Sequence, residues 1–414
     1  MLWLLVAVLL VPTRRSDFAM TLGGMVDSYV DPKTGVPLDH GVKIFIDAGN
    51  ATGFFDQFGI TRGNSSNSQV TTEYIDFRTG NVVVEPWEHL MQPGYYDFPQ
   101  PDAIPEDLLI TFGDFITKHG LEDAVPLIYE STGLGLRNMT RETTLFVLQS
   151  FGPSMARAML GKQGMFVPAS GRNQDLYDAV ADHLGDDVLY SSTVVDSWRT
   201  PHGVFLTVRN SKTGQITLIT ARRLLLAIEP TKGNMAPFDL DDNERTVLSK
   251  FTYTSEYTGL VNNSAFATNY SYFNLPAAAA PDHYLTLPDG SFTVRFDYLG
   301  GDNMFRVTIV GEETLDSAGA KELVQKDFDT LRQAGRLLDA KEGEQVSWVD
   351  FSAHGPMHAR VSVADLKDGF YQKLYALQGG RSTWWTGGAF SVNFQTTLWQ
   401  YDELLFPEIL KGLN

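Results

Sequence analysis

Two glycine pairs are the residues best placed to bind a ligand through the backbone. Gly23 and Gly24 open a turn-rich stretch over 22–45, and Gly387 and Gly388 lie between a strand-like run and an expected helix over 396–410. Glycine tolerates positive φ and lets backbone amides approach a ligand closely, which suits a pyrophosphate or a ring carbonyl. A glycine pair taken alone more often forms an ordinary turn than a ligand-binding site. The second pair precedes a helix, whose free N–H groups favour an electron-rich ligand edge.

Two histidines, His354 and His358, have the spacing that places two imidazoles on one helix face. Gly355 and Pro356 lie between them, so a helix is disfavoured and we expect loop histidines, with no metal site. The sequence contains no cysteine, which excludes thiol nucleophiles and thiolate metal sites. It also lacks a G-x-S-x-G nucleophile elbow, an H-E-x-x-H zinc helix, a G-x-x-x-x-G-K-[ST] phosphate loop and an EF-hand loop.

The composition is close to that of an average globular chain, with 43% hydrophobic and 20% charged residues in 414. Acidic residues outnumber basic ones 50 to 32, and the formal net charge is −18. This charge repels phosphate backbones and anionic headgroups, so we expect neither nucleic acid nor a membrane surface as a partner.

The apolar run over 1–11 is too short to span a bilayer. It has two interpretations, a signal-peptide core or a buried parallel strand. In a signal peptide the basic residues precede the apolar run, whereas here Arg14 and Arg15 follow it. Glycosylation sequons favour secretion weakly; otherwise the protein is expected in the cytoplasm. The sequons lie at Asn50, Asn64, Asn138, Asn262 and Asn269.

The order of elements predicts an α/β protein in which one sheet domain is interrupted twice. Short β segments over 22–45 precede a helical stretch over 104–160, and a helix near 174–185 precedes strands over 187–228. A second inserted segment contains strand candidates at 253–262, 291–299 and 304–311 and a helix at 318–338. A strand at 373–379 and the helix at 396–410 follow it. We expect a discontinuous domain from 1–50, 160–235 and 345–414. A second domain, α-rich over 51–159 and β-rich over 236–344, would bind the substrate.

The chain resembles the flavin-containing amine oxidase superfamily, in particular the fungal branch that includes beta-cyclopiazonate dehydrogenase. The resemblance is carried, in the family's order, by LGGMVDSYVDPKTGVPLDHGVKIF, GMFVPASGRNQDLYDAVADHLGDDVLYSSTVVDSWR, ARRLLLAIEPT and DGFYQKLYALQGGRSTWWTGGAFSVNFQTTLWQYDELLFPEIL. It implies a Rossmann-like FAD-binding domain with an inserted substrate domain, and FAD as the cofactor. The cofactor-binding residues that it implies are Gly23, Gly24, Val194, Gly387, Gly388, Ala389, Thr396 and Thr397.

One part of the family's pattern is missing. A G-x-G-x-x-G turn within a βαβ unit of about 30 residues should precede Gly23, but the 22 residues before Gly23 contain no glycine. A truncated or mis-spliced gene product is the leading explanation. We therefore expect the isoalloxazine half of an FAD site to be better preserved than the ADP half.

The resemblance implies an FAD-dependent oxidoreductase that oxidises a small amine or another secondary metabolite by hydride transfer. Trp384, Trp385 and Phe390 would wall an apolar substrate pocket, while Tyr371 and Tyr375 are better explained as ordinary core. Two alternatives stay open, namely a flavin-dependent double-bond isomerase and a non-catalytic remnant that no longer binds FAD. The sequence identifies no catalytic residue, and it leaves the substrate, the electron acceptor and the oligomeric state undecided.

Overall fold

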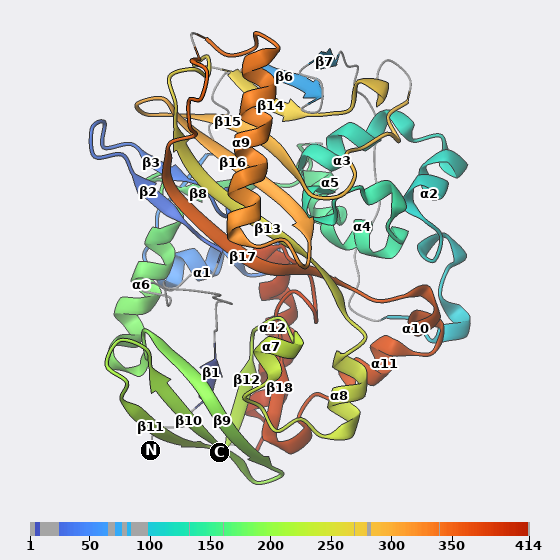
Figure 1. Ribbon diagram of the computed structural model, residues 1–414. Coiled ribbons are helices and arrows are strands. Elements are labelled where there is room, and N and C mark those ends of the chain that lie inside the picture. The colour runs from blue at the N-terminus through green and yellow to red at the C-terminus, as the bar shows by residue number, and fades with distance from the viewer. Residues whose placement is uncertain are drawn as a thin grey trace.

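The computed structural model describes residues 5–8, 25–64, 71–76, 81–83, 98–131, 133–159, 161–268, 270–279, 283–338 and 340–412. The sheets form two regions, one above the other in Figure 1, and the chain passes between them several times. No helix within these ranges is both long and apolar enough to cross a membrane.

The lower region contains a parallel sheet in the order β1-β12-β18, built from β1 (Leu5–Val8), β12 (Arg223–Leu226) and β18 (Thr383–Trp385). The strand interpretation of the apolar N-terminal run is therefore confirmed for Leu5–Val8. An antiparallel sheet lies beside it, formed by β9 (Ser192–Thr200), β10 (Gly203–Asn210) and β11 (Ile216–Ala221). In β10 the buried Val204, Leu206 and Val208 alternate with more exposed residues, as one buried sheet face requires.

Two small sheets connect the regions. One pairs β2 (Ser28–Val30) with β3 (Pro37–Asp39), and the other has the order β4-β8-β5, with β4 (Phe45–Ile46), β5 (Arg62–Asn64) and β8 (Met165–Pro168). Helices α1 (Ala51–Gln57) and α6 (Gln174–Leu184) pack here around the buried rings of Phe45, Phe55 and Phe166. Phe45 also stacks on Trp399 at 5.8 Å, which brings the N-terminal segment against the C-terminal helix.

The upper region is a seven-stranded sheet in the order β17-β13-β16-β15-β14-β6-β7. Its strands are β6 (Thr71–Asp76), β7 (Asn81–Val83), β13 (Thr252–Asn262), β14 (Tyr270–Asn274), β15 (Phe292–Gly300), β16 (Met304–Glu312) and β17 (Trp348–Arg360). Helix α9 (Ser317–Gln333) covers one face, where Val324 and Phe328 pack against Tyr257, Val261 and Phe305. The other face is directed away from α9.

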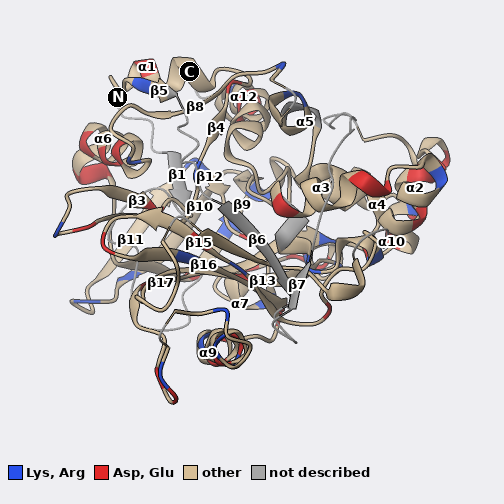
Figure 2. Cartoon of the chain, turned by 90° about the horizontal axis from the view of Figure 1, so that it is seen from above, with Lys and Arg blue, Asp and Glu red and all other residues tan. Residues whose placement is uncertain are grey.

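Helices cover the remaining edges. They are α2 (Phe112–His119), α3 (Val125–Ser131), α4 (Thr144–Ser150), α5 (Pro153–Met159), α7 (Lys232–Met235), α8 (Asp242–Leu248), α10 (Val363–Lys367), α11 (Phe370–Tyr375) and α12 (Gln395–Leu410). Short 3₁₀ turns occur at Pro101–Ala103, Glu106–Leu108, Glu122–Ala124, Gly133–Leu136, Met139–Arg141, Gly185–Asp187, Ala277–Ala279 and Gly380–Ser382. Acidic residues are prominent on the outer helix α6, which accounts for part of the negative charge (Figure 2).

The structure confirms the helical stretch over 104–160, the hairpin that runs into β12, and the strands and helices predicted over 253–338 and 396–410. The strand expected at 373–379 is wrong, because α11 occupies its first half. Phe370, Tyr371, Leu374 and Leu377 are all buried, and their spacing fits one side of a helix rather than the alternation of a strand.

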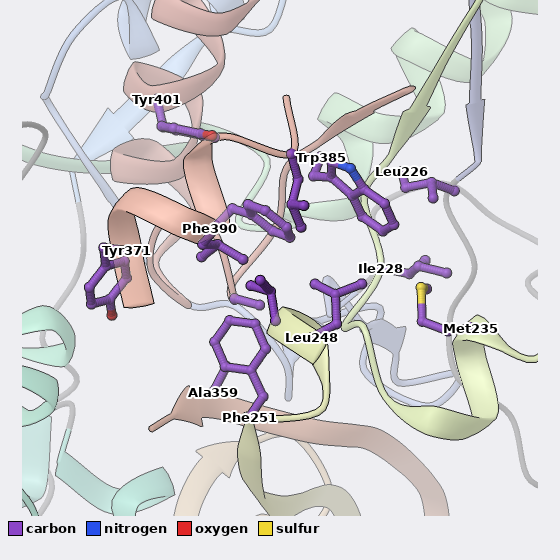
Figure 3. Packing of buried hydrophobic residues seen from close by; sticks show 14 of the residues in the cluster. Leu226, Ile228, Met235, Leu248, Phe251, Ala359, Tyr371, Trp385, Phe390 and Tyr401 are labelled. Carbon is purple, nitrogen blue, oxygen red and sulfur yellow. The ribbon is translucent and has the colours of Figure 1, made fainter. Parts of the chain in front are cut away.

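At two places the chain passes between the lower and upper regions at a different residue from the expected domain boundary. Leu248 and Phe251 contribute to the lower core with Leu226 and Trp385, although they follow the expected boundary at 235 (Figure 3). Strand β17 belongs to the upper sheet up to Arg360, beyond the expected boundary at 345. The chain therefore leaves the lower region near 251 and returns to it near 360.

A buried ion network holds the lower region together. The side chain of Arg199 on β9 is fully buried, and its Nη2 donates to Glu244 Oε2 at 2.7 Å while its Nε donates to Asp239 Oδ1 at 3.0 Å. Arg381, in the turn before β18, pairs with the same two carboxylates. Two positive and two negative charges thus cancel in the interior.

Replacing Arg199 with methionine should lower the free energy of unfolding by about 3–5 kcal/mol, because the buried Glu244 loses its main partner. Chemical denaturation measures this effect. The matched control is Arg141→Met, which removes an exposed pair with Asp289 and should cost less than about 1 kcal/mol. Equal effects of the two substitutions would contradict a stabilising role for the network.

Candidate functional site

The turn between β18 and α12 passes directly beside the end of β12. The amide of Thr386 donates to the Leu226 carbonyl at 2.9 Å, and the next residue, Gly387, has φ +102°. A Cβ on Gly388 would overlap with the side-chain amide of Asn393 and would lie 2.5 Å from Glu229 Oε1. The backbone conformation at Gly387 and the close packing at Gly388 therefore both require glycine.

Buried polar atoms without a hydrogen-bond partner among the described residues gather at this turn. They are Glu229 Oε2, Ser391 Oγ, Gln395 Oε1 and Thr396 Oγ1. The residue before α12, Phe394, gives the helix no side-chain cap. Buried polar groups in native proteins are nearly always paired. This group of atoms is therefore the place where a polar ligand would complete the structure.

The structure brings together only some of the predicted cofactor-binding residues. Gly387, Gly388 and Thr396 surround the group of unpaired atoms, and Ala389 is buried directly beside it. Thr397 follows on α12 and is half-buried, and Val194 is buried in β9 opposite Val208. Gly23 and Gly24 lie outside the described residues, so their predicted role stays a prediction.

The three aromatic residues predicted to wall a pocket do not share one surface. Trp385 and Phe390 stack with ring centroids 5.8 Å apart in the buried core (Figure 3). Trp384 is the neighbouring strand residue and points to the other side of β18, where the Arg223 guanidinium lies 4.9 Å from its ring centre. Tyr371 and Tyr375 stack on each other at 6.1 Å as part of the core.

His358 is a functional candidate that the sequence did not reveal. Its Nδ1 lies 3.1 Å from Ser150 Oγ, its Nε2 lies 3.9 Å from Glu256 Oε2, and its backbone N–H donates to Asn393 Oδ1 at 3.1 Å. A Cβ on Gly135 would overlap with the imidazole, so glycine makes room for the ring. His358 therefore links the turn that carries Asn393 to the upper sheet.

The expectation that His354 and His358 are loop residues is wrong, because both belong to β17. Each lies at an irregularity in the pairing with β13. His354 is an extra residue between the partners of Glu256 and Tyr257, and His358 has φ +52°. Such bulges redirect side chains and are common beside active sites. Within the described ranges, no group of three or more His, Asp or Glu residues could hold a metal ion.

A small pocket of about 10 Å³ lies at this junction and is lined by residues that include Ser150, His358, Gly388 and Asn393. A larger hollow of about 620 Å³, bounded by Asp47, Asp56 and Arg62, is wide open to solvent. None of the unpaired polar atoms around Gly388 line the larger hollow. We therefore assign the functional site to the junction.

Burial changes the proton affinity of both ionisable groups nearest the turn. It raises the pKa of Glu229 to about 8, although hydrogen bonding by Asn393 acts in the opposite direction. Burial lowers the pKa of His358 to about 3, and the positive charge of Arg360 adds to this shift. At neutral pH the site therefore holds a protonated carboxyl group and a neutral imidazole.

The face of the upper sheet that points away from α9 carries further ionisable groups. Asp297 on β15 accepts a hydrogen bond from Nε of Arg306 at 3.1 Å, and Nε of Arg295 lies 3.2 Å from the same carboxylate oxygen. Burial raises the pKa of Asp297, but the two arginines outweigh it and bring the pKa well below its ordinary value. Burial also brings the pKa of Glu256 up to about 7 and that of Lys43 down to about 7.

The raised pKa of Glu229 predicts a pH dependence of stability in the ligand-free protein. The folded state favours the protonated form, so this stabilisation is complete below the ordinary value of 4.5 and is lost as the pH rises towards 8. Relative to Glu229→Gln, the wild type should lose about 1.4 kcal/mol of unfolding free energy per pH unit across that window. Denaturation at several pH values measures this loss. The exposed Glu342→Gln should follow the wild type, and parallel profiles for all three proteins would refute the shift.

Comparisons with known proteins agree with this architecture. The chain is 30% identical over 408 residues to the FAD-dependent oxidoreductase pigF of Monascus ruber, covering 95% of this chain and 85% of the relative. It is 29% identical over 409 residues to beta-cyclopiazonate dehydrogenase of Aspergillus flavus, covering 95% and 86%. No family model matches the chain.

Solved structures show the same fold at much lower identity. A fatty acid isomerase from P. acnes that produces CLA superposes with a TM-score of 0.69 at 16% identity, covering 94% of this chain and 91% of the isomerase. A putrescine oxidase variant superposes with a TM-score of 0.60 at 12% identity and the same coverage. The chain therefore has the fold of amine-oxidase-type flavoenzymes, and it belongs to the fungal FAD-dependent oxidoreductases, among which beta-cyclopiazonate dehydrogenase is a similar relative.

Proposed function

We propose that this protein is an FAD-dependent oxidoreductase that oxidises a small molecule at the junction of the two regions. The observation that carries the proposal is the group of unpaired polar atoms around Gly388, between the end of β12 and the start of α12. The relatives named as FAD-dependent oxidoreductases match the chain over nearly its whole length and support the choice of cofactor.

The residues at the turn fit an isoalloxazine ring. Its edge offers both an N–H donor and carbonyl acceptors, and the turn offers both kinds of partner. Thr396 Oγ1 and Ser391 Oγ can donate or accept, Gln395 Oε1 accepts, and a protonated Glu229 donates. The positive end of the α12 helix dipole favours an electron-rich ring edge.

FAD would supply a hydride acceptor when bound, and residues of the turn such as Gly388 and Thr396 would hold and orient its ring. The small pocket beside His358 adjoins this turn and marks the side from which a substrate would approach the ring. Oxidation of an amine or alcohol also releases a proton, which needs an acceptor. Glu256 is the residue that accepts it, because its pKa of about 7 suits proton transfer at neutral pH and it adjoins His358.

The flavin content of the purified protein tests the proposal. A visible flavin spectrum that is bleached by substrate without oxygen, and restored by an electron acceptor, supports an oxidoreductase. A flavin that stays oxidised while the substrate changes its double bonds would support the isomerase alternative. Protein that is colourless and does not bind added FAD would support the non-catalytic alternative and refute the proposal.

The substitution Gly388→Ala should weaken FAD binding at least about tenfold, which corresponds to 1.4 kcal/mol. The added methyl group would overlap with the Asn393 amide and push Glu229 away from the turn. Titration with FAD, followed by flavin fluorescence, measures the affinity. The control is Gly380→Ala, because a Cβ there meets nothing within 4 Å. If both variants bind FAD equally well, the turn around Gly388 does not hold the cofactor.

A further inference from the structure

Glu229 is a carboxyl group inside the protein that no cationic side chain of the described residues neutralises. Its Oε1 lies 2.5 Å from the place of a Cβ on Gly388, and Asn393 donates a hydrogen bond to its side chain. By contrast, the buried Glu244 of the lower region pairs with Arg199 and Arg381. A carboxylate taken out of water without a cation is costly, so Glu229 is built to hold a proton.

A protonated carboxyl group has one O–H donor, and this donor needs an acceptor. Glu229 Oε2 is buried and has no hydrogen-bond partner among the described residues. Ser391 Oγ and Thr396 Oγ1 at the same turn are also unpaired, so they do not supply the acceptor. The Glu229 carbonyl accepts hydrogen bonds from the Thr231 amide and from Asn234 Nδ2, both at 2.8 Å, which fixes the main chain here. The missing acceptor therefore belongs to a ligand at the turn.

The other titratable groups around the turn ionise at different pH values. Tyr253 on β13 lies within electrostatic range of Glu229, and burial raises its pKa well above the ordinary value. Burial lowers the pKa of His358 on β17 to about 3 and raises that of Asp402 on α12 to about 6. Arg360 on β17 lines the pocket as a cation. Among these groups Glu229, with a pKa of about 8, is the one that titrates between pH 7 and pH 9.

We infer that Glu229 contacts the flavin ring and that the site binds FAD together with one proton, which the Glu229 carboxyl group holds and donates to an acceptor atom of the ring. This inference rests on the proposed function, because it requires a ring at the turn. An ionised Glu229 would face the ring's acceptor atoms with a negative charge and no donor. FAD therefore binds the protonated form, and ionisation of Glu229 competes with binding.

Calorimetric titration of the full chain with FAD, in buffers of different ionisation enthalpy, tests this coupling. Near pH 9 most of the free protein has lost the Glu229 proton, so binding should take up close to one proton per FAD. Near pH 6.5 the proton is already present, and no uptake is expected. The affinity should be constant below pH 7 and fall about tenfold per pH unit above about 8. A constant affinity without proton uptake would overturn the inference.

Two substitutions assign the proton to its residue. Glu229→Gln keeps the size of the side chain and an N–H donor but cannot ionise, so its FAD affinity should not depend on pH and proton uptake should vanish. The matched control is Glu313→Gln, which removes an exposed carboxylate that also lies within electrostatic range of Tyr253. This control should behave like the wild type. Proton uptake that persists in Glu229→Gln would place the proton on another group and contradict the inference.

The titration also separates this inference from the proposed function. FAD that binds without a proton, and is bleached by a substrate, would refute the role of Glu229 alone. FAD that binds with one proton but is not bleached by any substrate would refute the oxidoreductase and leave the role of Glu229 standing. Protein that binds no FAD at any pH would refute both.

Discussion

The irregular pairing of β13 with β17 is the constraint on which the site depends. These two long strands carry the chain between the regions, and their register shifts where His354 and His358 occur. A regular ladder would alternate side chains strictly, so the shifts decide which residues face the junction. The positive φ of His358 costs on the order of 1–3 kcal/mol, and its bonds with Ser150 and Asn393 hold it in place. His358 therefore carries backbone strain at the place where the two regions meet.

Two arginine clusters lie in the interior. In the lower region Arg199 and Arg381 face Asp239 and Glu244, and the charges cancel within the chain. On the upper sheet Arg295 and Arg306 both pair with Asp297, and Glu256 lies within electrostatic range of them. Both clusters are expensive to bury, and in each the carboxylates offset part of the cost of desolvating the arginines.

The sequence predicted those features that depend on local patterns. Helical spacing identified α6 and α9, alternation identified β10, and a glycine pair before a helix identified Gly387 and Gly388. The strand expected at 373–379 failed because Phe370 and Tyr371, just before it, complete a helical pattern with Leu374. Glu256 and Lys43 could not be found in this way. Each is an isolated charged residue in an ordinary stretch. Strand register places Glu256 on its face of the upper sheet, and Lys43 lies in the loop before β4.

The side-chain amide of Asn393 determines which groups donate and which accept hydrogen bonds between the two regions. Its Oδ1 accepts the backbone N–H of His358, so its Nδ2 is the atom directed at Gly388 and at Glu229 Oε1. Glu229 therefore receives a donor at one oxygen. Since burial keeps this carboxyl protonated at neutral pH, its proton belongs on Oε2, the oxygen without a partner among the described residues. The strained histidine in the upper sheet thus determines, through one amide, that Glu229 presents an O–H donor to whatever occupies the turn.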